Sequence, residues 1–202
     1  SEVEILAIKG VALPGRRVKA DAVVYAGDVS ALGEGMFGKM VSRAGPAVGP
    51  RHRSLSAVTL CAALRTEAPL DYPTVVFSPH YEAEFHALFG TRALPSAPTI
   101  YLCAPNPPSP DGTQGALMIL NAPADGDRRP YGEEDVARCQ HQAMATLDRA
   151  GLSAQITDMV PSTSADFAQL LPATGGAIYG RAAHGWTASF QRNGQRTKIR
   201  GL

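Results

Sequence analysis

Five histidines and three cysteines are among the residues of this chain that could bind a metal ion or act as an acid, a base or a nucleophile. None of them falls into a spacing that is typical of a zinc site, and Cys139 and His141 are too close along a predicted helix to face each other. The chain also lacks the G-x-S-x-G elbow of the α/β hydrolases. The sequence therefore indicates no metal site. These residues are His52, His80, His86, His141, His184, Cys61, Cys103 and Cys139.

Asp125 and Asp127 are close enough in sequence to form paired carboxylates, but the glycine between them predicts a turn instead. Arg192 and Arg196 could bind an anion, although solvated surface arginines explain the same pattern. The chain has neither of the patterns that cradle phosphate groups, G-x-G-x-x-G and G-K-[S/T]. We therefore interpret the Gly- and Pro-rich residues 33–50 as a mobile crossover between domains.

Large apolar and aromatic groups gather among glycines near the end of the chain. The sequence there runs A-I-Y-G-R-A-A-H-G-W-T-A-S-F and includes the single tryptophan, Trp186. Tyr179, Trp186 and Phe190 could line an apolar binding site, with His184 as a polar contact. Packing in an ordinary core explains the same residues, and their spacing does not separate the two hypotheses.

The composition is that of a globular protein with a sizeable core and gives no sign of a nucleic-acid partner. Hydrophobic residues make up 45 % of the 202 residues, and the formal net charge is +1 with a pI near 7.8. Three widely spaced cysteines argue against a disulfide framework and favour a reducing, cytoplasmic setting. No signal peptide is visible, and no apolar run is long enough to span a bilayer, so we expect any membrane contact to be peripheral.

Short apolar runs predict most of the strands. In the first fifty residues we expect strands at 3–8, 11–13 and 17–20, and a buried strand at 20–26. Further along, the expected strands cover residues 55–64, 74–77, 98–103, 116–121 and 154–159. Gly175 and Gly176 predict a turn or a close backbone approach, and residues 177–179 could form a short strand or one buried turn.

Capping residues predict two short helices in the first half of the chain. Asp28 is expected to cap a helix that begins at residue 29, and Ser78 one that begins at Pro79 and ends before Gly90. The large apolar residues of the second helix recur at helical spacing and are predicted to share one face. They are Tyr81, Phe85, Leu88 and Phe89.

The strongest helix pattern covers residues 132–150, where acidic residues in the first turn suit the helix dipole. Leu147 is expected to face the core and Gln142 to lie on the other face. Thr163 and Asp166 predict a capping box for the last helix. Strands separated by long helices, without a regular βαβ repeat, predict an α+β fold with a mixed, mainly antiparallel sheet and helices on one face.

The last forty residues resemble the carotenoid, or phytoene-type, desaturases. The strings that carry the resemblance are T-S-A-D-F at 163–167, P-A-T-G-G-A-I-Y-G-R at 172–181, A-S-F at 188–190 and R-N-G-Q-R at 192–196. Earlier strings, A-D-A-V-V at 20–24 and N-A-P-A-D-G-D at 121–127, extend the resemblance over essentially the whole chain. Within the family, the chain is most similar to the 1-hydroxycarotenoid 3,4-desaturases, also called methoxyneurosporene dehydrogenases.

The resemblance implies an FAD-dependent oxidoreductase with an amine-oxidase-like fold, in which the flavin takes a hydride from a carotenoid substrate. Residues 1–50 would be strands of the FAD domain and a crossover, 51–175 the substrate-binding domain, and 176–202 a return segment toward the FAD domain. Val3 corresponds to a family valine that packs beside the flavin's adenine. Because a polyene has almost no polar groups, its site should be an apolar tunnel lined by Tyr179, His184, Trp186 and Phe190.

The resemblance also implies that the chain corresponds to the middle and late part of a longer desaturase. Neither the family's Gly-rich dinucleotide motif nor its G-G-x-x-H-P-G flavin segment occurs within residues 1–202. We therefore expect the chain alone to be inactive, to hold no FAD and to self-associate through uncovered apolar surface. The alternative is a non-catalytic domain that binds a hydrophobic ligand or a protein partner.

Overall fold

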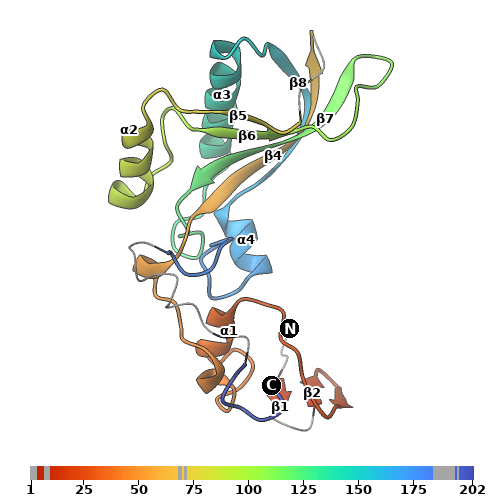
Figure 1. Ribbon diagram of the computed structural model, residues 1–202, viewed down its shortest axis with the longest axis vertical. Coiled ribbons are helices and arrows are strands. Elements are labelled where there is room, and N and C mark those ends of the chain that lie inside the picture. The colour runs from red at the N-terminus through yellow and green to blue at the C-terminus, as the bar shows by residue number, and fades with distance from the viewer. Residues whose placement is uncertain (1–3, 7–9, 68–69, 71, 184–193, 195) are drawn as a thin grey trace.

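The computed structural model describes the chain except for residues 1–3, 7–9, 68–69, 71, 184–193 and 195. Figure 1 shows an upper part built on a five-stranded sheet and a smaller lower part that holds the N-terminal strands and the C-terminus. Each part has its own cluster of buried apolar side chains. In the described part of the chain, no helix is both long enough and apolar enough to cross a bilayer.

The five-stranded sheet is antiparallel throughout, with the strand order β5-β6-β7-β4-β8. Its strands are β4 (Ser56–Thr66), β5 (Thr74–Val76), β6 (Ile100–Cys103), β7 (Thr113–Ala122) and β8 (Ala154–Ser162). The strands predicted in this region are therefore confirmed, whereas the expected mixed sheet is wrong. Residues 104–112 join β6 to β7 as a hairpin, whereas the other neighbouring strands pair across longer intervening segments.

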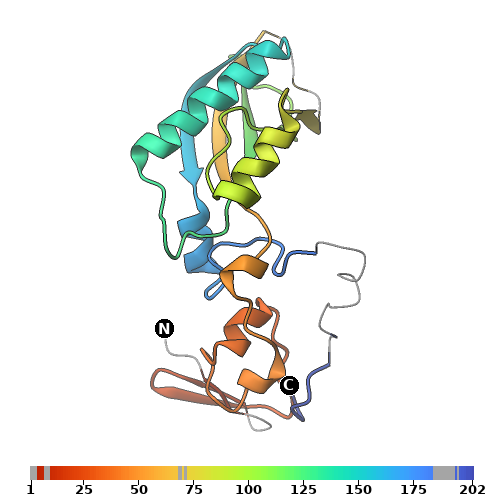
Figure 2. The ribbon, with the colours of Figure 1, turned by 90° about the vertical axis from the view of Figure 1, so that its left-hand side faces the viewer.

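Alternation along the central strands places their large apolar residues on one face of the sheet. Helices α2 (Tyr81–Phe85) and α3 (Glu133–Arg149) lie on that side, as predicted (Figure 2). The core between the sheet and α3 is formed by Val58, Leu60, Leu64, Ile100, Leu102, Met118, Leu120, Cys139, Ala143 and Leu147. This confirms the α+β class and the single helical layer.

Helix α3 (Glu133–Arg149) confirms the strongest helix prediction. Cys139, Ala143 and Leu147 recur every four residues and are buried against the sheet. The prediction that Gln142 lies on the solvent side is wrong, because this residue is half-buried and its Oε1 is enclosed without a hydrogen-bond partner in the described part of the chain. Gln142 stands three residues after Cys139 and therefore borders the buried stripe.

Helix α2 (Tyr81–Phe85) begins two residues later than predicted and continues into a π-helical turn (His86–Thr91). Ser78 does not cap the helix directly. Its Oγ accepts a hydrogen bond from the His80 N–H at 3.1 Å, in the turn before the helix. The π turn carries the chain past Gly90, so the left-handed residue at the end is Arg92, with a φ of 53°.

The aromatic residues predicted to share one face of this helix do lie together, with their rings in contact along it. Leu88 is buried, whereas the aromatic side chains remain partly or largely exposed. Glu84 takes the core side instead, and its carboxylate accepts hydrogen bonds from the N–H and the hydroxyl of Thr99 at 3.0 and 2.7 Å. These bonds offset the cost of burying the carboxylate. Glu84 and Leu88 are one helical turn apart and define the buried face, which turns Tyr81, Phe85 and Phe89 away from the core.

Helix α4 (Ser164–Leu170) begins at the predicted capping box. The Thr163 hydroxyl accepts a hydrogen bond from the Ala165 N–H at 3.3 Å, and the Asp166 carboxylate accepts one from the Thr163 N–H at 2.7 Å. This exchange satisfies donors that the first turn of a helix leaves free.

The lower part contains a three-stranded antiparallel sheet of β1 (Glu4–Leu6), β2 (Gly10–Leu13) and β3 (Arg16–Lys19), in the region where short strands were predicted. Helix α1 (Val29–Gly33) is capped by Asp28, whose carboxylate accepts a hydrogen bond from the Ser30 N–H at 2.8 Å.

Leu32 and Val41 form the centre of the lower apolar cluster, and Ile199 and Leu202 from the end of the chain pack against them. Residues 33–50, which follow Leu32 and include Val41, run through turns and the short 3-10 helix Ser42–Ala44. The end of the chain therefore helps to close the core of the lower part.

The buried strand predicted at residues 20–26 is wrong. Val24 is 91 % exposed, and the segment has no regular secondary structure. A strand needs a neighbour for its backbone groups. In the described part of the chain, this segment has one backbone hydrogen bond to another segment, from the Val23 N–H to the Gly201 carbonyl at 2.7 Å.

Two segments far apart in the sequence run antiparallel beside each other between the upper and lower parts, and Arg53 and Arg181 form a bridge between them. Residues 177–179 belong to this pairing as an irregular bend and not as a strand. The backbone hydrogen bonds are Ile178 N to Leu55 O (3.1 Å), Ser54 N to Gly180 O (2.9 Å) and Ala182 N to His52 O (2.7 Å).

Candidate functional site

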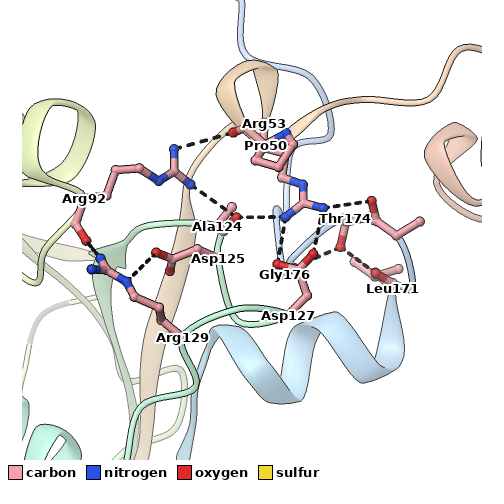
Figure 3. Close-up of polar contacts among 11 residues, drawn as sticks. Pro50, Arg53, Arg92, Ala124, Asp125, Asp127, Arg129, Leu171, Thr174 and Gly176 are labelled. Atoms are coloured by element: carbon pink, nitrogen blue, oxygen red, sulfur yellow. Dashed lines mark hydrogen bonds and ion pairs between the residues drawn. The ribbon is translucent and has the colours of Figure 1, made fainter.

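A buried arginine is the centre of the junction between the two parts (Figure 3). Arg53 lies just before β4 and is 9 % exposed. Its guanidinium donates two hydrogen bonds of 2.9 Å to the two carboxylate oxygens of Asp127, and a longer one of 3.3 Å to the carbonyl of Ala124. A bidentate pair of this kind fixes orientation as well as distance. Arg53 therefore ties the start of β4 to the turn that follows β7.

Of two adjacent glycines, one makes room for this arginine and the other lets the chain pass close to the backbone of Ser164. Gly175 and Gly176 have φ values of 63° and 86°, which side chains rarely adopt. A Cβ on Gly175 would lie 2.0 Å from Nη1 of Arg53, and a Cβ on Gly176 would lie 2.2 Å from the carbonyl oxygen of Ser164. The Gly-Gly pair is thus a turn and a close backbone approach at once, which confirms the sequence prediction.

The ion pair changes the titration of Asp127. Hydrogen bonding from Arg53 lowers the pKa of the Asp127 carboxyl below its ordinary value of 3.8, and outweighs the partial burial that acts in the opposite direction. Asp127 is therefore ionised at neutral pH and balances the charge of Arg53. The Nε of Arg53 is enclosed and has no hydrogen-bond partner among the described residues, which leaves one buried donor unused.

A second ion pair lies beside the first. The Nε of Arg129 is 3.2 Å from the carboxylate of Asp125, and the same guanidinium donates to the carbonyl of Arg92. Arg92 reaches in turn toward the carbonyls of Pro50 and Ala124, at 3.5 and 3.4 Å (Figure 3). The two arginine networks therefore share the carbonyl of Ala124.

These arginines line two adjoining hollows, with volumes of about 760 and 290 Å³, that share Gly90 and Arg92. We call them the junction hollows. The larger one is also lined by Arg51, Arg53, Phe85, Phe89 and Ala182. The smaller one is also lined by Pro50, Thr91, Asp125, Arg128 and Arg129.

Three aromatic rings lie along α2 and its π turn and lead into the larger hollow. The ring centroids of Tyr81 and Phe85 are 4.6 Å apart, and those of Phe85 and Phe89 are 5.8 Å apart. Side chains four residues apart meet on a helix surface, which explains the contact. We call these three residues the aromatic row.

The residues of the hollows are suited to binding and not to proton transfer. A guanidinium stays charged across the physiological pH range and offers only donors, so it holds an anion but does not act as a base. Within the described ranges, no group of three His, Cys, Asp or Glu side chains is placed to hold a metal ion. The arrangement therefore points to recognition of an anionic group beside an apolar one.

The face of the five-stranded sheet opposite the helices is apolar and partly exposed. Strand register places two neighbouring rows of uncharged side chains on this face, and exposed Asp158, opposite Ala63, lies in the next row. Val160 is 65 % exposed, and Val75 and Tyr101 are 43 % and 37 % exposed. We call this surface the open sheet face. Its rows are Val75, Tyr101, Ile119 and Thr59, and then Cys103, Leu117, Cys61 and Val160.

Of the site residues predicted from sequence, Tyr179 alone lies within the described residues. Its side chain is 78 % exposed, its N–H donates to the Ser54 Oγ at 3.1 Å, and it is not among the residues that line the junction hollows. The other predicted residues lie outside the described residues, so their roles stay predictions. They are His184, Trp186, Phe190 and Val3.

Sequence reasoning missed Arg53 and Arg92. The D-G-D string was predicted to be a turn, and this is confirmed, because the Asp125 carbonyl accepts hydrogen bonds from the N–H groups of the two arginines that follow. Arg53 and Asp127 are 74 residues apart, and no spacing rule connects them. The pattern that could have indicated this pair is an arginine directly before one apolar strand and an acidic turn directly after another apolar strand.

Comparison with known proteins relates nearly the whole chain to curated desaturases. It is 41 % identical over 198 residues to the hydroxyneurosporene desaturase of Rubrivivax gelatinosus, covering 93 % of this chain and 37 % of that protein. It is 34 % identical over 197 residues to the hydroxyneurosporene desaturase of Cereibacter sphaeroides, covering 93 % and 38 %. A 1-hydroxycarotenoid 3,4-desaturase of a Flavobacterium species is 26 % identical over 157 residues, covering 71 % and 30 %. No family model matches the chain.

By sequence, the chain is a relative of the carotenoid desaturases and corresponds to part of one. The relatives that it matches over nearly its whole length are named hydroxyneurosporene desaturase, and it spans little more than a third of their length, 37 % and 38 %. This confirms the resemblance read from the sequence.

Proposed function

We propose that the chain is part of a carotenoid desaturase that acts on hydroxyneurosporene or a related 1-hydroxy- or 1-methoxycarotenoid in carotenoid biosynthesis. The observation that carries the proposal is the 41 % identity over 93 % of the chain to a hydroxyneurosporene desaturase. In the reaction, two neighbouring carbons each lose a hydrogen and a C=C bond forms. One hydrogen leaves as a hydride to an acceptor and the other as a proton.

We assign to this chain the task of holding the polyene. The open sheet face supports the assignment, because four neighbouring strands spaced about 4.8 Å apart present side chains without charge. A long hydrocarbon is stabilised by leaving water for such a surface. Tyr179, His184, Trp186 and Phe190 are proposed, from sequence, to line an apolar tunnel for the polyene, with His184 near the polar end of the substrate.

The family resemblance makes FAD the proposed hydride acceptor and an amine-oxidase-like fold the proposed architecture of the whole protein. When bound, a flavin supplies the redox chemistry, and the protein supplies binding and orientation. The dinucleotide needs a Gly-rich turn before a helix. The described residues offer no such turn, and α1 has only five residues. The residues present therefore do not fit FAD by themselves, and we derive no step through it.

The purified chain is accordingly expected to carry no flavin. Its absorption spectrum should lack the visible band of oxidised flavin even after incubation with excess FAD and gel filtration. A stoichiometric flavin band that survives gel filtration would contradict this expectation.

The function is tested by exchanging the matching segment of the Rubrivivax gelatinosus enzyme for residues 1–202 and supplying hydroxyneurosporene. We expect a product that lacks two hydrogens, detected by chromatography and mass spectrometry. Val160→Asp, on the open sheet face, should lower product formation. Val24→Asp, at an exposed position of the lower part, should not.

A binding measurement separates the enzyme from the alternative function. The chain is titrated with a detergent-solubilised carotenoid, and quenching of Trp186, the single tryptophan, is followed. Quenching together with product from the exchanged enzyme supports the desaturase. Quenching without product from a folded exchanged enzyme favours a domain that only binds a hydrophobic ligand. Loss of both rejects the proposal.

A further inference from the structure

Positive charge exceeds negative charge around the junction hollows. Two of the five arginines that line them are balanced, Arg53 by Asp127 and Arg129 by Asp125. The remaining three have no carboxylate within ion-pair distance in the part of the chain that the structure describes. They are Arg51, Arg92 and Arg128. The whole chain has a formal charge of only +1, so this excess is a local property of the junction.

One of the arginines also presents a buried donor without a partner. Arg53 is 9 % exposed, it lines the larger hollow, and its Nε–H has no acceptor among the described residues. Buried donors are normally paired, so an unpaired one at the wall of a hollow indicates that something else supplies the acceptor. Asp125 lines the smaller hollow and not the larger one; its Oδ2 pairs with Arg129, and its enclosed Oδ1 has no partner among the described residues.

The same hollow has an apolar wall. Phe85 and Phe89 line it, and the aromatic row continues from them to Tyr81, which is 55 % exposed. A ligand that satisfied both walls would carry an anionic group for the arginines and a hydrocarbon part for the rings. Arginine is suited to phosphate oxygens, and aromatic side chains are enriched where a protein meets the boundary between lipid and water.

We propose that the larger junction hollow binds the phosphate head group of an anionic phospholipid, with the aromatic row against the adjoining acyl chains. The chain would then contact a bilayer surface at α2 and its π turn. The lipid phosphate forms ion pairs with Arg51 and Arg92 and accepts a hydrogen bond from the unused Nε–H of Arg53. This inference rests on the geometry of the hollow and is independent of the proposed desaturase function.

The test is flotation of the 202-residue chain with vesicles of phosphatidylcholine alone and of phosphatidylcholine mixed with phosphatidylglycerol. We expect binding to the mixed vesicles only. The binding should weaken with salt, because the screening length falls from about 10 Å at 0.1 M to about 3 Å at 1 M. Equal binding to both kinds of vesicle would overturn the proposal.

Matched variants locate the contact. Arg51→Gln removes an exposed arginine of the hollow and should weaken binding about fivefold, since one basic residue near an anionic surface contributes that order of affinity. Arg17→Gln removes the same charge from the exposed strand β3 and should leave binding within about twofold. Circular dichroism checks that both variants are folded. Equal losses, or no loss with Arg51→Gln, would overturn the proposal.

The apolar half of the site has its own variant. Phe89→Ser should weaken binding to the mixed vesicles about tenfold, because a partly exposed ring would no longer be buried in lipid. Leu170→Ser replaces an exposed apolar side chain on α4 by the same polar residue and should have no such effect. Inorganic phosphate provides the last arm. If it binds the chain tightly in an Arg51-dependent way while the mixed vesicles do not bind, the ligand is a soluble phosphate ester and the lipid proposal is rejected.

Discussion

Arg53 and Asp127 differ in how far water reaches them, and this decides which partner is costly to lose. The side chain of Arg53 is 7 % exposed and that of Asp127 is 37 % exposed. If Arg53 were removed, water could still solvate the carboxylate. If Asp127 were neutralised, the arginine would keep its charge in an enclosed site with only carbonyl groups as acceptors.

Asp127→Asn is therefore expected to destabilise the chain by about 1–3 kcal/mol at neutral pH. Urea unfolding followed by circular dichroism gives the free energy of unfolding. Asp148→Asn, at an exposed position on α3, removes the same charge and should change stability by no more than about 0.5 kcal/mol.

The same pair predicts a pH dependence with a definite sign. Because the pKa of Asp127 is lower in the folded protein than its ordinary value of 3.8, its stabilisation is complete above that value. The stabilisation is lost as the pH falls below 3.8 and through the folded pKa, where the carboxylate takes up a proton. The stability difference between the chain and Asp127→Asn should shrink over this acid range. A difference that stays constant there would contradict the assigned pair.

The three cysteines, Cys61 (exposed), Cys103 (half-buried) and Cys139 (buried), should react with thiol reagents in the order of their exposure. Cys61 lies on the open sheet face, whereas Cys139 belongs to α3 and is buried against the sheet, where burial raises the pKa of its thiol to about 11. Because the thiolate is the reactive form, Cys139 should be modified only on unfolding, while Cys61 is modified in the native protein. Timed alkylation and peptide mass spectrometry measure this order. Equal rates at both positions would contradict the packing of α3.

At the residue scale, partners that are close in sequence could be predicted and distant ones could not. Asp28 with α1, and Thr163 with Asp166, follow rules of local spacing, and the structure confirms them. Arg53 finds Asp127 only because β4 and β7 pair over their whole length, which brings the start of one strand beside the end of the other. The charge of each residue was readable, but its partner depends on topology.

At the element scale, periodicity identified the long strands and α3 because their patterns extend over several turns or alternations. For α2 it identified the shared aromatic face but not which side of the helix is buried. The apolar spacing of Tyr81, Phe85 and Phe89 is real, but Glu84 has a buried partner in Thr99 and takes the core side. Periodicity failed at residues 20–26, where an apolar run was predicted to be a strand but has no neighbouring strand in the described part of the chain to pair with.

The facing of α3 gives the prediction for this scale. Leu147→Ala should destabilise the chain by about 2–5 kcal/mol, because the side chain is fully buried against the sheet and its loss leaves a cavity. His141→Ala, on the exposed side of the same helix, should stay within about 0.5 kcal/mol. Denaturant midpoints provide the comparison. Small, equal effects at the two positions would reject the assignment of faces.

At the scale of the whole molecule, the sequence predicted the α+β class but not the order of the strands. β4 pairs with β7 on one side and with β8 on the other, although both partners come much later in the chain. No local rule selects these partners, since they are chosen by which apolar faces can close over α3. The domain boundaries after residues 50 and 175 stay a prediction. Close to both of them, residues 52–55 run next to residues 178–182.

The open sheet face is the whole-molecule feature that most affects behaviour in solution. It presents partly exposed, uncharged and largely apolar side chains, which promote association, and a second copy can cover it by the same surface in a two-fold arrangement. We expect light scattering to show a dimer that forms with increasing concentration. Because apolar contact drives it, high salt should not dissociate it.

Two matched valines test this association. Val160→Lys places a charge on the open sheet face at a side chain that is already 65 % exposed, so the change should shift the chain to monomer without unfolding it. Val24→Lys introduces the same charge at an isolated position that is 91 % exposed in the lower part, and should leave the dimer intact. If the chain stays monomeric at all concentrations, or if Val24→Lys dissociates the dimer as fully as Val160→Lys, the open sheet face is not the contact.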